Sequence, residues 1–369
     1  MPRHTTPRND RKGPMIKIGV IGGGKFGTNH LITLSQLERQ GRVKLAALSD
    51  LSPAILEAQN KKFGVKGYQD HREMLRQEEL DAVTIATPDF AHRQVALDSI
   101  RSGKNVLVEK PLDVTAEGCR EIIEAAREHK VFLEVDFHKR YDPYHQETER
   151  LVQEGALGEI QYGYVHMEDK IVVPRDWFPG WAPRSSPAWF LGVHFYDLIR
   201  WIIRKEPKTV FATGLKRVLA GLGVDTYDSI QAKIGFEGGA SITFDTSWIL
   251  PDGFEAVVNQ GFRLVGDKGI AEVDSQDRGM RTCLGQTGMQ THNLGFLQEK
   301  KDKWGNAAFA GYGIESIADF VDNLEFLSKG GDAKKLSGTV TALGADGLAA
   351  TKMAEAVHES LKSGKIVNI

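Results

Sequence analysis

Cysteine is scarce in this sequence, and long apolar runs are absent. The 369 residues contain two cysteines, Cys119 and Cys283, which lie far apart and in no spacing typical of a metal site. Two isolated thiols fit a reducing compartment, and we therefore expect a cytoplasmic protein without a bound metal. No run of about 18 apolar residues occurs, so we expect no membrane-spanning helix and no membrane partner.

An excess of charge of one sign is also missing. Lysine and arginine together number 47, and aspartate and glutamate number 49, which leaves a formal net charge of −2. This balance, and the lack of any recognisable nucleic-acid-binding signature, argue against a nucleic-acid partner. The sequence contains no internal repeat and no low-complexity tract.

The N-terminal stretch lacks the apolar segment of a signal peptide. Residues 1–14, MPRHTTPRNDRKGP, are polar and contain several prolines. We expect them to form a disordered tail, with a basic arm for a partner as the alternative. The remaining length is long for one domain and predicts two.

Short apolar runs alternate with helical stretches between Ile16 and Phe137. The runs lie at 16–21, 43–48, 65–68, 82–87, 105–109 and 131–135, and the stretches at 25–38, 53–63, 70–77, 90–102 and 116–129. This alternation predicts a parallel sheet with helices on both faces. Strands covered on both sides are apolar along their length, as these are. We therefore predict a doubly wound α/β domain over residues 15–138.

The pattern changes after Tyr141. A connecting helix leads to a strand at 160–170, an irregular aromatic stretch at 174–189 and a helix at 189–203. Strands then follow at 209–219, 229–237, 240–249, 254–259, 262–266 and 270–274, before helices at 313–328 and 345–362. Turn sequences between the strands predict antiparallel meanders. Residues 139–369 thus read as an α+β domain with a large, open, mainly antiparallel sheet, in which 275–312 stay unassigned.

A glycine motif follows the first predicted strand directly. Gly22, Gly24 and Gly27 fit G-x-G-x-x-G at the start of a helix. The first glycine permits a tight turn, the second lets a pyrophosphate approach the backbone, and the third lets helix and strand pack closely. The N-terminus of the helix offers amide donors to phosphates. In this context the motif predicts a dinucleotide-binding site.

An acid stands at the end of the second predicted strand. Asp50 lies about where a ribose-binding carboxylate is expected, roughly 20 residues after the glycine motif. A carboxylate there accepts hydrogen bonds from both ribose hydroxyls and repels a 2′-phosphate. No arginine or lysine follows it in SDLSP, so NAD is favoured over NADP as the cofactor. The alternative is that Asp50 merely ends the strand.

Glu109-Lys110-Pro111 ends another predicted strand, on the edge where doubly wound sheets bind ligands. Proline stops the strand and restricts the backbone of Lys110. Burial or a neighbouring cation lowers the pKa of such a lysine toward the range useful for proton transfer. We interpret Lys110 as an acid/base group, and the alternative is a surface lysine. Thr87-Pro88 ends the previous strand, and His92 contacts the cofactor or caps the next helix.

The predicted helix at 189–203 carries a polar face. Phe190, His194, Asp197 and Trp201 share one narrow face at about 100° per residue. His194 is either a satisfied core residue or a substrate-facing one. Asp197 either holds the imidazole of His194 in one tautomer or has only a structural role.

The irregular stretch before this helix is predicted to form a wall of the substrate pocket. It contains tryptophans that suit the C–H face of a sugar and cations that suit carboxylates or phosphates. The alternative is that the tryptophans are core and the arginines solvated. These residues are Trp177, Trp181 and Trp189, with Lys170, Arg175 and Arg184. Lys139, Arg140 and Tyr141, after the last parallel strand, are further candidates for this cleft.

Several motifs together resemble one family. GVIGGGKFG, SD, VTIATPDFAH, VEKPL, GVHFYDLIRW and the tail ADGLAATKMAEAVHESLKSGKIV match in order the glucose-fructose oxidoreductase / inositol dehydrogenase / rhizopine-catabolism (Gfo/Idh/MocA) family over nearly all of 15–369. The resemblance implies an NAD(P)-binding Rossmann domain at 15–138 and a substrate-binding and oligomerisation domain at 139–369. It also implies a homodimer or homotetramer formed through the open sheet.

The resemblance further implies roles for individual residues. The lysine matching Lys110 acts in proton transfer, and the histidine matching His194 shares it beside the substrate. The expected cofactor contacts are Gly22, Gly24, Lys25, Phe26, Gly27, Asp50, Thr87, Pro88, His92, Glu109 and Lys110. The expected substrate contacts are Lys110, Arg140, Asp176, Trp177, Arg184, Phe190 and His194.

Phe190 departs from the family pattern. Many sugar and inositol dehydrogenases of this family carry an aspartate four residues before the histidine, and phenylalanine cannot replace its chemistry. Three interpretations stay open: Lys110 and His194 suffice, Asp176 or Asp169 supplies the carboxylate, or Phe190 packs on an apolar part of a different substrate.

The predicted function follows from these residue assignments and from the family resemblance. We expect an NAD(P)-dependent oxidoreductase that moves a hydride between nicotinamide and a carbinol or carbonyl carbon of a sugar, sugar acid or cyclitol. The alternatives are a non-catalytic dinucleotide- or sugar-sensing regulator and an NAD-dependent glycosidase that uses transient oxidation.

Overall fold

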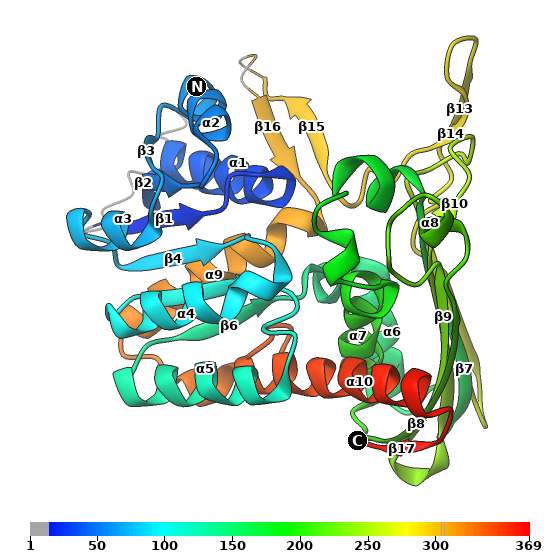
Figure 1. The fold of residues 1–369 in the computed structure, drawn as a ribbon. Coiled ribbons are helices and arrows are strands. Elements are labelled where there is room, and N and C mark those ends of the chain that lie inside the picture. The colour runs from blue at the N-terminus through cyan, green and yellow to red at the C-terminus, as the bar shows by residue number, and fades with distance from the viewer. Residues whose placement is uncertain (1–14, 304, 306) are drawn as a thin grey trace, which may run out of the picture.

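A computed structural model describes residues 15–303, 305 and 307–369 of the chain. Two sheets stand next to each other, as Figure 1 shows: a six-stranded parallel sheet from the N-terminal half and a seven-stranded mixed sheet from the C-terminal half. The predicted fold class, a Rossmann sheet followed by an α+β unit with a mainly antiparallel sheet, is confirmed. Among the described helices, none is both long enough and apolar enough to cross a membrane.

The N-terminal sheet has the strand order β3-β2-β1-β4-β5-β6, and all its pairs are parallel. The order reverses between β1 and β4, and doubly wound sheets bind ligands at that point. The predicted strands are confirmed within two or three residues at their ends. Their bounds are β1 Ile16–Ile21, β2 Val43–Ser49, β3 Lys66–Tyr68, β4 Ala82–Ile85, β5 Asn105–Glu109 and β6 Leu133–Asp136.

The helices between these strands lie close to their predicted positions. They are α1 Lys25–Arg39, α2 Pro53–Phe63, α3 His71–Gln77, α4 His92–Arg101 and α5 Ala116–His129. Ser52 caps α2 by accepting from the amide of Ile55, and Thr115 caps α5 by accepting from Gly118. Side-chain oxygens at these positions satisfy amides that have no partner inside the helix.

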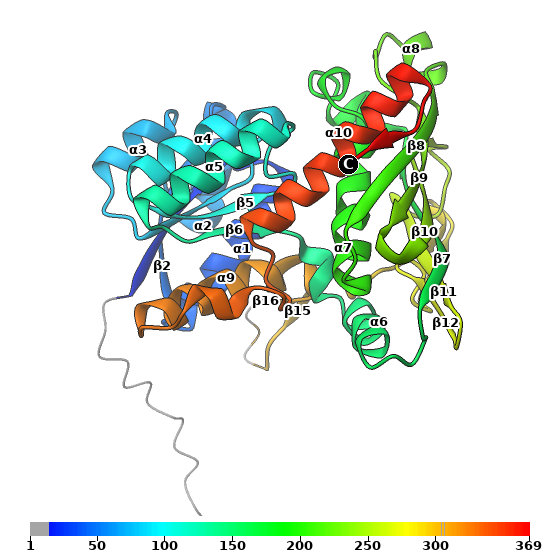
Figure 2. The same ribbon diagram turned by 90° about the horizontal axis from the view of Figure 1, so that it is seen from below.

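Two late helices connect the halves of the molecule. Helix α9 (Tyr312–Ser328) packs on α1, and its Ile317 and Phe320 belong to the same buried cluster as β1 and β2. Helix α10 (Gly344–Ser363) runs from α5 to the second sheet, as Figure 2 shows. The core of the N-terminal sheet is therefore completed by residues from the C-terminal end of the chain.

The second sheet has the order β12-β11-β7-β10-β9-β8-β17. Strands β7 and β10 pair in parallel, and the other neighbours are antiparallel. The bounds are β7 Ile160–Lys170, β8 Pro207–Leu215, β9 Ser229–Phe236, β10 Ser241–Leu250, β11 Val258–Gly266, β12 Ile270–Asp274 and β17 Val367–Asn368.

One strand prediction in this sheet is wrong. Residues 254–259 and 262–266 were expected as two strands, but one strand, β11, spans 258–266. Gly261 lies within it, and a Cβ there would come within 2.8 Å of the carbonyl oxygen of Val273. The glycine therefore permits close approach of the neighbouring strand β12 rather than forming a turn.

Helices α6 (Pro143–Gln153) and α7 (Val193–Ile203) lie with α10 on one side of this sheet (Figure 1). Their apolar residues form a buried cluster with Trp248 and Phe244 from the facing strand β10. The opposite face carries exposed aromatic side chains, among them Tyr162 and Tyr164 on β7.

The segment with no predicted structure forms two short hairpins. They pair β13 (Arg281–Leu284) with β14 (Gly288–Thr291) and β15 (Gln298–Lys301) with β16 (Ala307–Ala310). Strand β16 is attached to α1, because the side-chain amide of Gln36 exchanges two hydrogen bonds with the backbone of Phe309.

Candidate active site

Two neighbouring cavities lie where the halves of the molecule meet. The first, of about 580 Å³, is bordered by the loops after β1, β2, β4 and β5 and by aromatic residues of segment 178–190. The second, of about 510 Å³, is bordered by the start of α1, strands β7 and β11, α7 and residues from the segment 291–312. Lys25, Phe26, Phe178 and Phe190 border both.

The three motif glycines have different surroundings in the first cavity. A Cβ on Gly22, whose φ is +97°, would lie 2.4 Å from the carbonyl oxygen of Ala86. A Cβ on Gly27 would lie 1.9 Å from the carbonyl oxygen of Gly22. Around Gly24, by contrast, a Cβ meets no described atom within 4 Å. Gly22 and Gly27 thus permit the tight turn and close packing, and Gly24 leaves open the space that a pyrophosphate needs.

Asp50 lies at the edge of the same cavity. One carboxylate oxygen accepts from the amide of Gly23 at 2.8 Å, and the other accepts from the amide of Ser52, also at 2.8 Å. The carboxylate is therefore fixed between the glycine loop and the start of α2. Each oxygen keeps a lone pair for a ribose hydroxyl.

Lys110 is buried at the end of β5, beside the first cavity. Its ammonium donates to the carbonyl oxygen of Phe190 at 2.8 Å and lies 4.8 Å from the centre of the phenyl ring. Burial lowers the pKa of Lys110, and neighbouring carboxylates, Glu109 first among them, partly oppose that shift. A lysine in this setting can hold or release a proton closer to neutrality than a solvated one.

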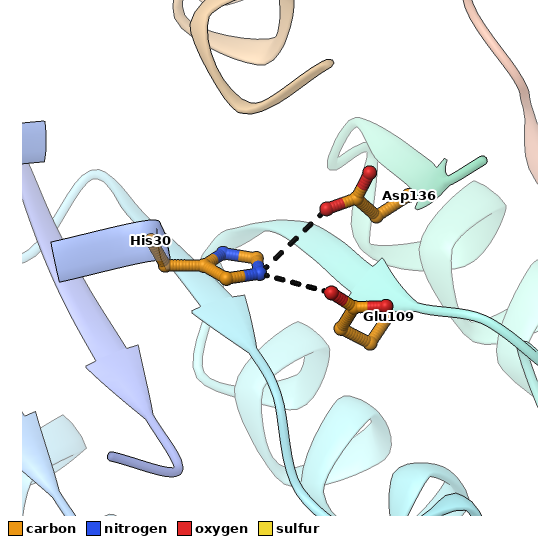
Figure 3. A group of neighbouring side chains, drawn as sticks. All are labelled: His30, Glu109 and Asp136. Atoms are coloured by element: carbon orange, nitrogen blue, oxygen red, sulfur yellow. Dashed lines mark hydrogen bonds and ion pairs between the residues drawn. The ribbon is translucent and has the colours of Figure 1, made fainter. Parts of the chain in front are cut away.

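A buried cluster lies directly behind Lys110. Figure 3 shows the imidazole of His30 pointing between Glu109 and Asp136, with its Nε2 3.3 Å and 3.6 Å from their oxygens. Burial acts to raise the pKa of Glu109, but the hydrogen bond and charge of His30 hold it below its usual value. Burial and the charge of Glu109 raise the pKa of Asp136 to about 7. The contact at 3.3 Å shows that Glu109 directs its carboxylate toward His30.

Ligand atoms of His30, Glu109 and Asp136 lie within 4.8 Å of one another, close enough to hold a metal ion. The direct contact between Nε2 of His30 and Glu109 gives the cluster another explanation, a hydrogen-bonded support beneath the loop that carries Lys110. Both carboxylates lie on the Nε2 side of the ring, whereas Nδ1 of His30 and Oδ1 of Asp136 have no hydrogen-bonding partner among the described residues.

His92 is placed differently from the prediction that it contacts the cofactor or caps its helix. The side chain is buried, and its Nδ1 and Nε2 lie 2.6 Å and 2.9 Å from the carbonyl oxygens of Pro111 and Thr87. It does not border the first cavity. His92 instead joins the loops after β4 and β5, which carry Thr87, Pro88 and Lys110.

His194 borders the second cavity from the first turn of α7. Its ring meets that of His138 edge to face at 4.9 Å, and its Nδ1 has no hydrogen-bonding partner among the described residues. Burial, reinforced by the charge of Lys110, holds the pKa of His194 well below its usual value. The ring is therefore neutral and has a nitrogen free to pair with a ligand.

Asp197 does not hold the imidazole of His194, which was one of its two predicted roles. Asp197 makes a two-point ion pair with Arg140, in which Nε of the arginine lies 2.8 Å from one carboxylate oxygen. Both side chains are buried. The sequence places Phe190 and His194 on one helical face, but a wider turn at Ala188–Gly192 precedes α7 and alters that spacing.

Three predicted substrate residues border neither cavity. Arg140 is occupied by its ion pair with Asp197. Asp176 is exposed and paired with Arg175. Arg184 stacks its guanidinium on the ring of Phe90, 3.5 Å from its centre. Of the other predicted substrate residues, Trp177, Phe190 and His194 border the second cavity, and Lys110 borders the first.

Lys139 gives the second cavity a further cation. The side chain is buried and donates to Oε1 of Gln260 on β11. Burial lowers the pKa of Lys139 to about 7, against the opposing charge of Asp142. Lys139 is thus a residue predicted for the cleft that does border a cavity, whereas its neighbour Arg140 faces Asp197.

Several bordering residues were not predicted. His138 follows β6, and Gln260 lies on β11, whereas Asn293, Phe296 and Tyr312 come from the segment left unassigned. Asn293 donates to the hydroxyl of Tyr312 at 3.2 Å and to the carbonyl of Ser275 at 2.9 Å. Nothing periodic in this segment indicated that it folds back over the cavity.

Family models match both halves of the chain. Residues 16–137 match the oxidoreductase family with an NAD-binding Rossmann fold, and residues 145–272 match the GFO/IDH/MocA C-terminal domain. Inositol 2-dehydrogenase of Rhizobium meliloti is 24% identical over 360 residues, which cover 96% of this chain and 99% of the relative.

Solved structures show the same fold. Scyllo-inositol dehydrogenase from Lactobacillus casei, with bound NAD(H) and scyllo-inositol, gives a TM-score of 0.76 at 21% identity and covers 96% of this chain and 99% of its own. GenD2 from gentamicin A biosynthesis, in complex with NAD, gives a TM-score of 0.79 at 22% identity and covers 99% of both chains.

The chain belongs to the Gfo/Idh/MocA oxidoreductase family. It is an NAD-dependent dehydrogenase-type enzyme related to the inositol dehydrogenases. The predicted family, the enzyme class and NAD as the cofactor are thereby confirmed.

Proposed function

We propose that this enzyme oxidises a hydroxyl of a sugar, sugar acid or cyclitol, or reduces the corresponding carbonyl, with Lys110 as acid/base and His194 as its partner. The observation that carries the proposal is the buried ammonium of Lys110 beside the first cavity, under a residue, Phe190, that also borders the second. A proton on Lys110 is thus available at the junction of both cavities.

The residues of the first cavity suit a dinucleotide. The open space at Gly24 accepts the pyrophosphate, Asp50 accepts the ribose hydroxyls, and Thr87 and Pro88 border the cavity toward Lys110. When bound, the nicotinamide supplies the hydride acceptor or donor. Lys25 and Phe26, which border both cavities, help to separate the reacting groups from water.

The proton follows a simple route in this proposal. In the oxidation direction neutral Lys110 accepts the hydroxyl proton of the substrate, and in reduction its ammonium returns that proton. The neutral ring of His194 accepts a hydrogen bond from the same or a neighbouring hydroxyl. Trp177, Phe178 and Phe296 offer apolar surface to the C–H face of a ring.

The test is turnover of purified protein with NAD and a panel of cyclitols, sugars, sugar acids and aryl glycosides, followed by the absorbance of reduced nicotinamide and of released aglycone. Net reduction with at least one polyol supports the proposal. Cofactor binding without turnover by any candidate supports a regulator instead, and release of an aglycone without net reduction supports a glycosidase.

We also propose that copies of the chain associate through the open face of the second sheet. Tyr162 and Tyr164 on β7 are 57% and 44% exposed there, and Phe211 on β8 is 42% exposed. Exposed aromatic residues on one sheet face are typical of an interface.

A further inference from the structure

Four buried carboxylates act electrostatically on Lys110. They belong to Glu109, Asp89, Asp169 and Asp136. Glu109 and Asp136 both direct a carboxylate oxygen toward Nε2 of His30, as Figure 3 shows. Asp89 accepts from the indole of Trp181 at 2.6 Å and from the hydroxyl of Ser185 at 2.9 Å. Asp169 is the one member of this set with neither a side-chain hydrogen bond nor an ion pair among the described residues, since Asp136, whose Oδ1 also lacks a hydrogen-bonding partner, lies 3.6 Å from Nε2 of His30.

Asp169 also borders the second cavity, near the end of β7. The residue is 3% exposed, and its Oδ1 is buried without a hydrogen-bonding partner among the residues that the structure describes. A buried carboxylate oxygen without a donor costs free energy, so its retention calls for a ligand that pairs with it. The charges of Lys110 and Lys139 act on the Asp169 carboxylate. His194 borders the same cavity.

We propose that Asp169 is a substrate-binding carboxylate of this site, which accepts hydrogen bonds from ring hydroxyls and holds a negative charge opposite Lys110. The inference rests on the proposed function and specifies its substrate as a polyhydroxylated ring with adjacent hydroxyls, because one carboxylate accepts from two neighbouring donors. Asp169 thereby supplies the carboxylate that position 190 lacks, since Phe190 neither accepts a proton nor orients a hydroxyl.

The charges around Asp169 agree with this role. Burial raises the pKa of Asp169 to about 7, and the charges of Lys110 and Lys139 oppose that shift. Hydroxyl donors favour the ionised carboxylate when a substrate binds. The other ionisable groups that border this cavity are Lys25, Tyr312 and the neutral rings of His138 and His194.

The experiment compares Asp169→Asn with Glu168→Gln. Glu168 precedes Asp169 on β7 but points to the opposite face of the sheet, where it accepts from Asn259 at 2.8 Å, so it is a matched carboxylate-to-amide control. Two readouts are taken on each full-length variant. The first is KM and kcat for a polyol that the wild type turns over. The second, without substrate, is the pH at which Lys110 becomes reactive toward an amine reagent, followed by peptide mass spectrometry.

We expect Asp169→Asn to raise KM about tenfold, the loss typical of a hydrogen bond to a charged group, with a smaller change in kcat. We also expect the labelling midpoint of Lys110 to move to lower pH by about one pH unit, because loss of a nearby negative charge favours the neutral amine. Asp169→Glu recovers part of the affinity, and Glu168→Gln behaves like the wild type in both readouts.

The outcomes separate this inference from the proposed function. Wild-type turnover with an unchanged KM and an unchanged labelling midpoint in Asp169→Asn overturns the role of Asp169 and leaves the dehydrogenase in place. A shifted midpoint in a protein that turns over no polyol overturns the proposed function and supports the placement of the Asp169 charge opposite Lys110.

Discussion

The first cavity contains a glycine loop whose backbone a ligand can approach, whereas no glycine among the described residues borders the second. Gly22, Gly24 and the amide-bound Asp50 offer the shape and polarity of a generic dinucleotide site. Lys139, Asp169 and His194 offer instead a particular arrangement of charge. A cofactor common to many enzymes can be bound by the backbone, but a substrate must be distinguished by side chains.

Lys110 and Phe190 join these two regions. The carbonyl of Phe190 holds the ammonium of Lys110, and its ring packs against Trp181 at 4.8 Å and Trp248 at 6.0 Å. The position where the family resemblance led us to expect an aspartate is thus part of an aromatic cluster in this chain. The comparison predicts that substitutions in the glycine loop mainly affect cofactor binding, and that removal of the Lys110 ammonium mainly affects chemistry.

The largest effect is expected for Lys110→Ala. Removal of the proposed acid/base group lowers kcat by about 10²- to 10⁴-fold, the contribution typical of general acid–base catalysis. NAD affinity stays near that of the wild type, because the glycine loop and Asp50 are unchanged. Steady-state kinetics and calorimetric titration with NAD measure the two effects.

Lys104→Ala is the matched control for this substitution. Lys104 lies just before β5, where it donates to the backbone carbonyl of Leu80 at 2.8 Å, away from both cavities. We expect wild-type kcat. A Lys110→Ala variant that turns over as fast as this control rules out proton transfer by Lys110.

The second-largest effect is expected for a substitution within the glycine loop. Gly24→Ala places a methyl group in open space, so the fold persists, but that methyl occupies the place of the pyrophosphate. We expect NAD affinity to fall by about 100-fold or more, as for the loss of a close backbone approach, with a cost in stability of about 1 kcal/mol at most. Thermal unfolding and NAD titration separate the two quantities.

Gly27→Ala is the contrasting variant. Its methyl would lie 1.9 Å from the carbonyl of Gly22, so helix α1 must shift, and the protein loses stability as well as NAD affinity. Equal melting temperatures for both variants contradict the distinct roles assigned to the two glycines.

The fold and the first cavity could be predicted because their signals are local. Each strand of the N-terminal sheet is a short apolar run, and the residues after β1, β2 and β5 include a recognisable motif or acid. Parallel order then brings these loops to one edge of the sheet. The positions of Gly24, Asp50 and Lys110 follow from chain order and sheet geometry alone.

The second cavity could not be predicted to the same degree, because its residues meet only in the folded chain. Gln260 directly precedes Gly261, a glycine that looks like a turn, and Asn293 lies in a segment without any period. Arg140 and Lys139 are neighbours in sequence, yet Arg140 faces Asp197 and Lys139 faces the cavity. A difference of this kind depends on long-range packing, which adjacent residues do not encode.

A smaller effect on affinity tests the choice of cofactor. Asp50→Asn keeps an acceptor for only one of the two amides, those of Gly23 and Ser52, and removes the charge that repels a 2′-phosphate. We expect the ratio of NAD to NADP affinity to fall by about tenfold, since one charge–charge interaction near the protein surface is lost. Titration with both cofactors gives the ratio. A loss of equal size for both cofactors contradicts the ribose assignment.

The smallest effect on turnover is expected at the open sheet face, which lies away from both cavities. Tyr164 is 44% exposed on β7, between Arg263 of β11 and Thr243 of β10. Tyr164→Glu places a charge in the middle of the proposed interface, where an unpaired buried charge is costly, so the oligomer dissociates. Light scattering after size-exclusion chromatography then gives the mass of one chain, while kcat changes by about twofold or less.

Leu222→Glu is the control for added charge at an exposed apolar residue. Leu222 is 53% exposed and follows the short helix α8 (Val218–Gly221), off the strands of the sheet. It should leave the mass unchanged. If Tyr164→Glu and Leu222→Glu both keep an oligomeric mass, the copies meet on another surface. If the wild type already has the mass of one chain, the exposed aromatic face serves a purpose other than self-association.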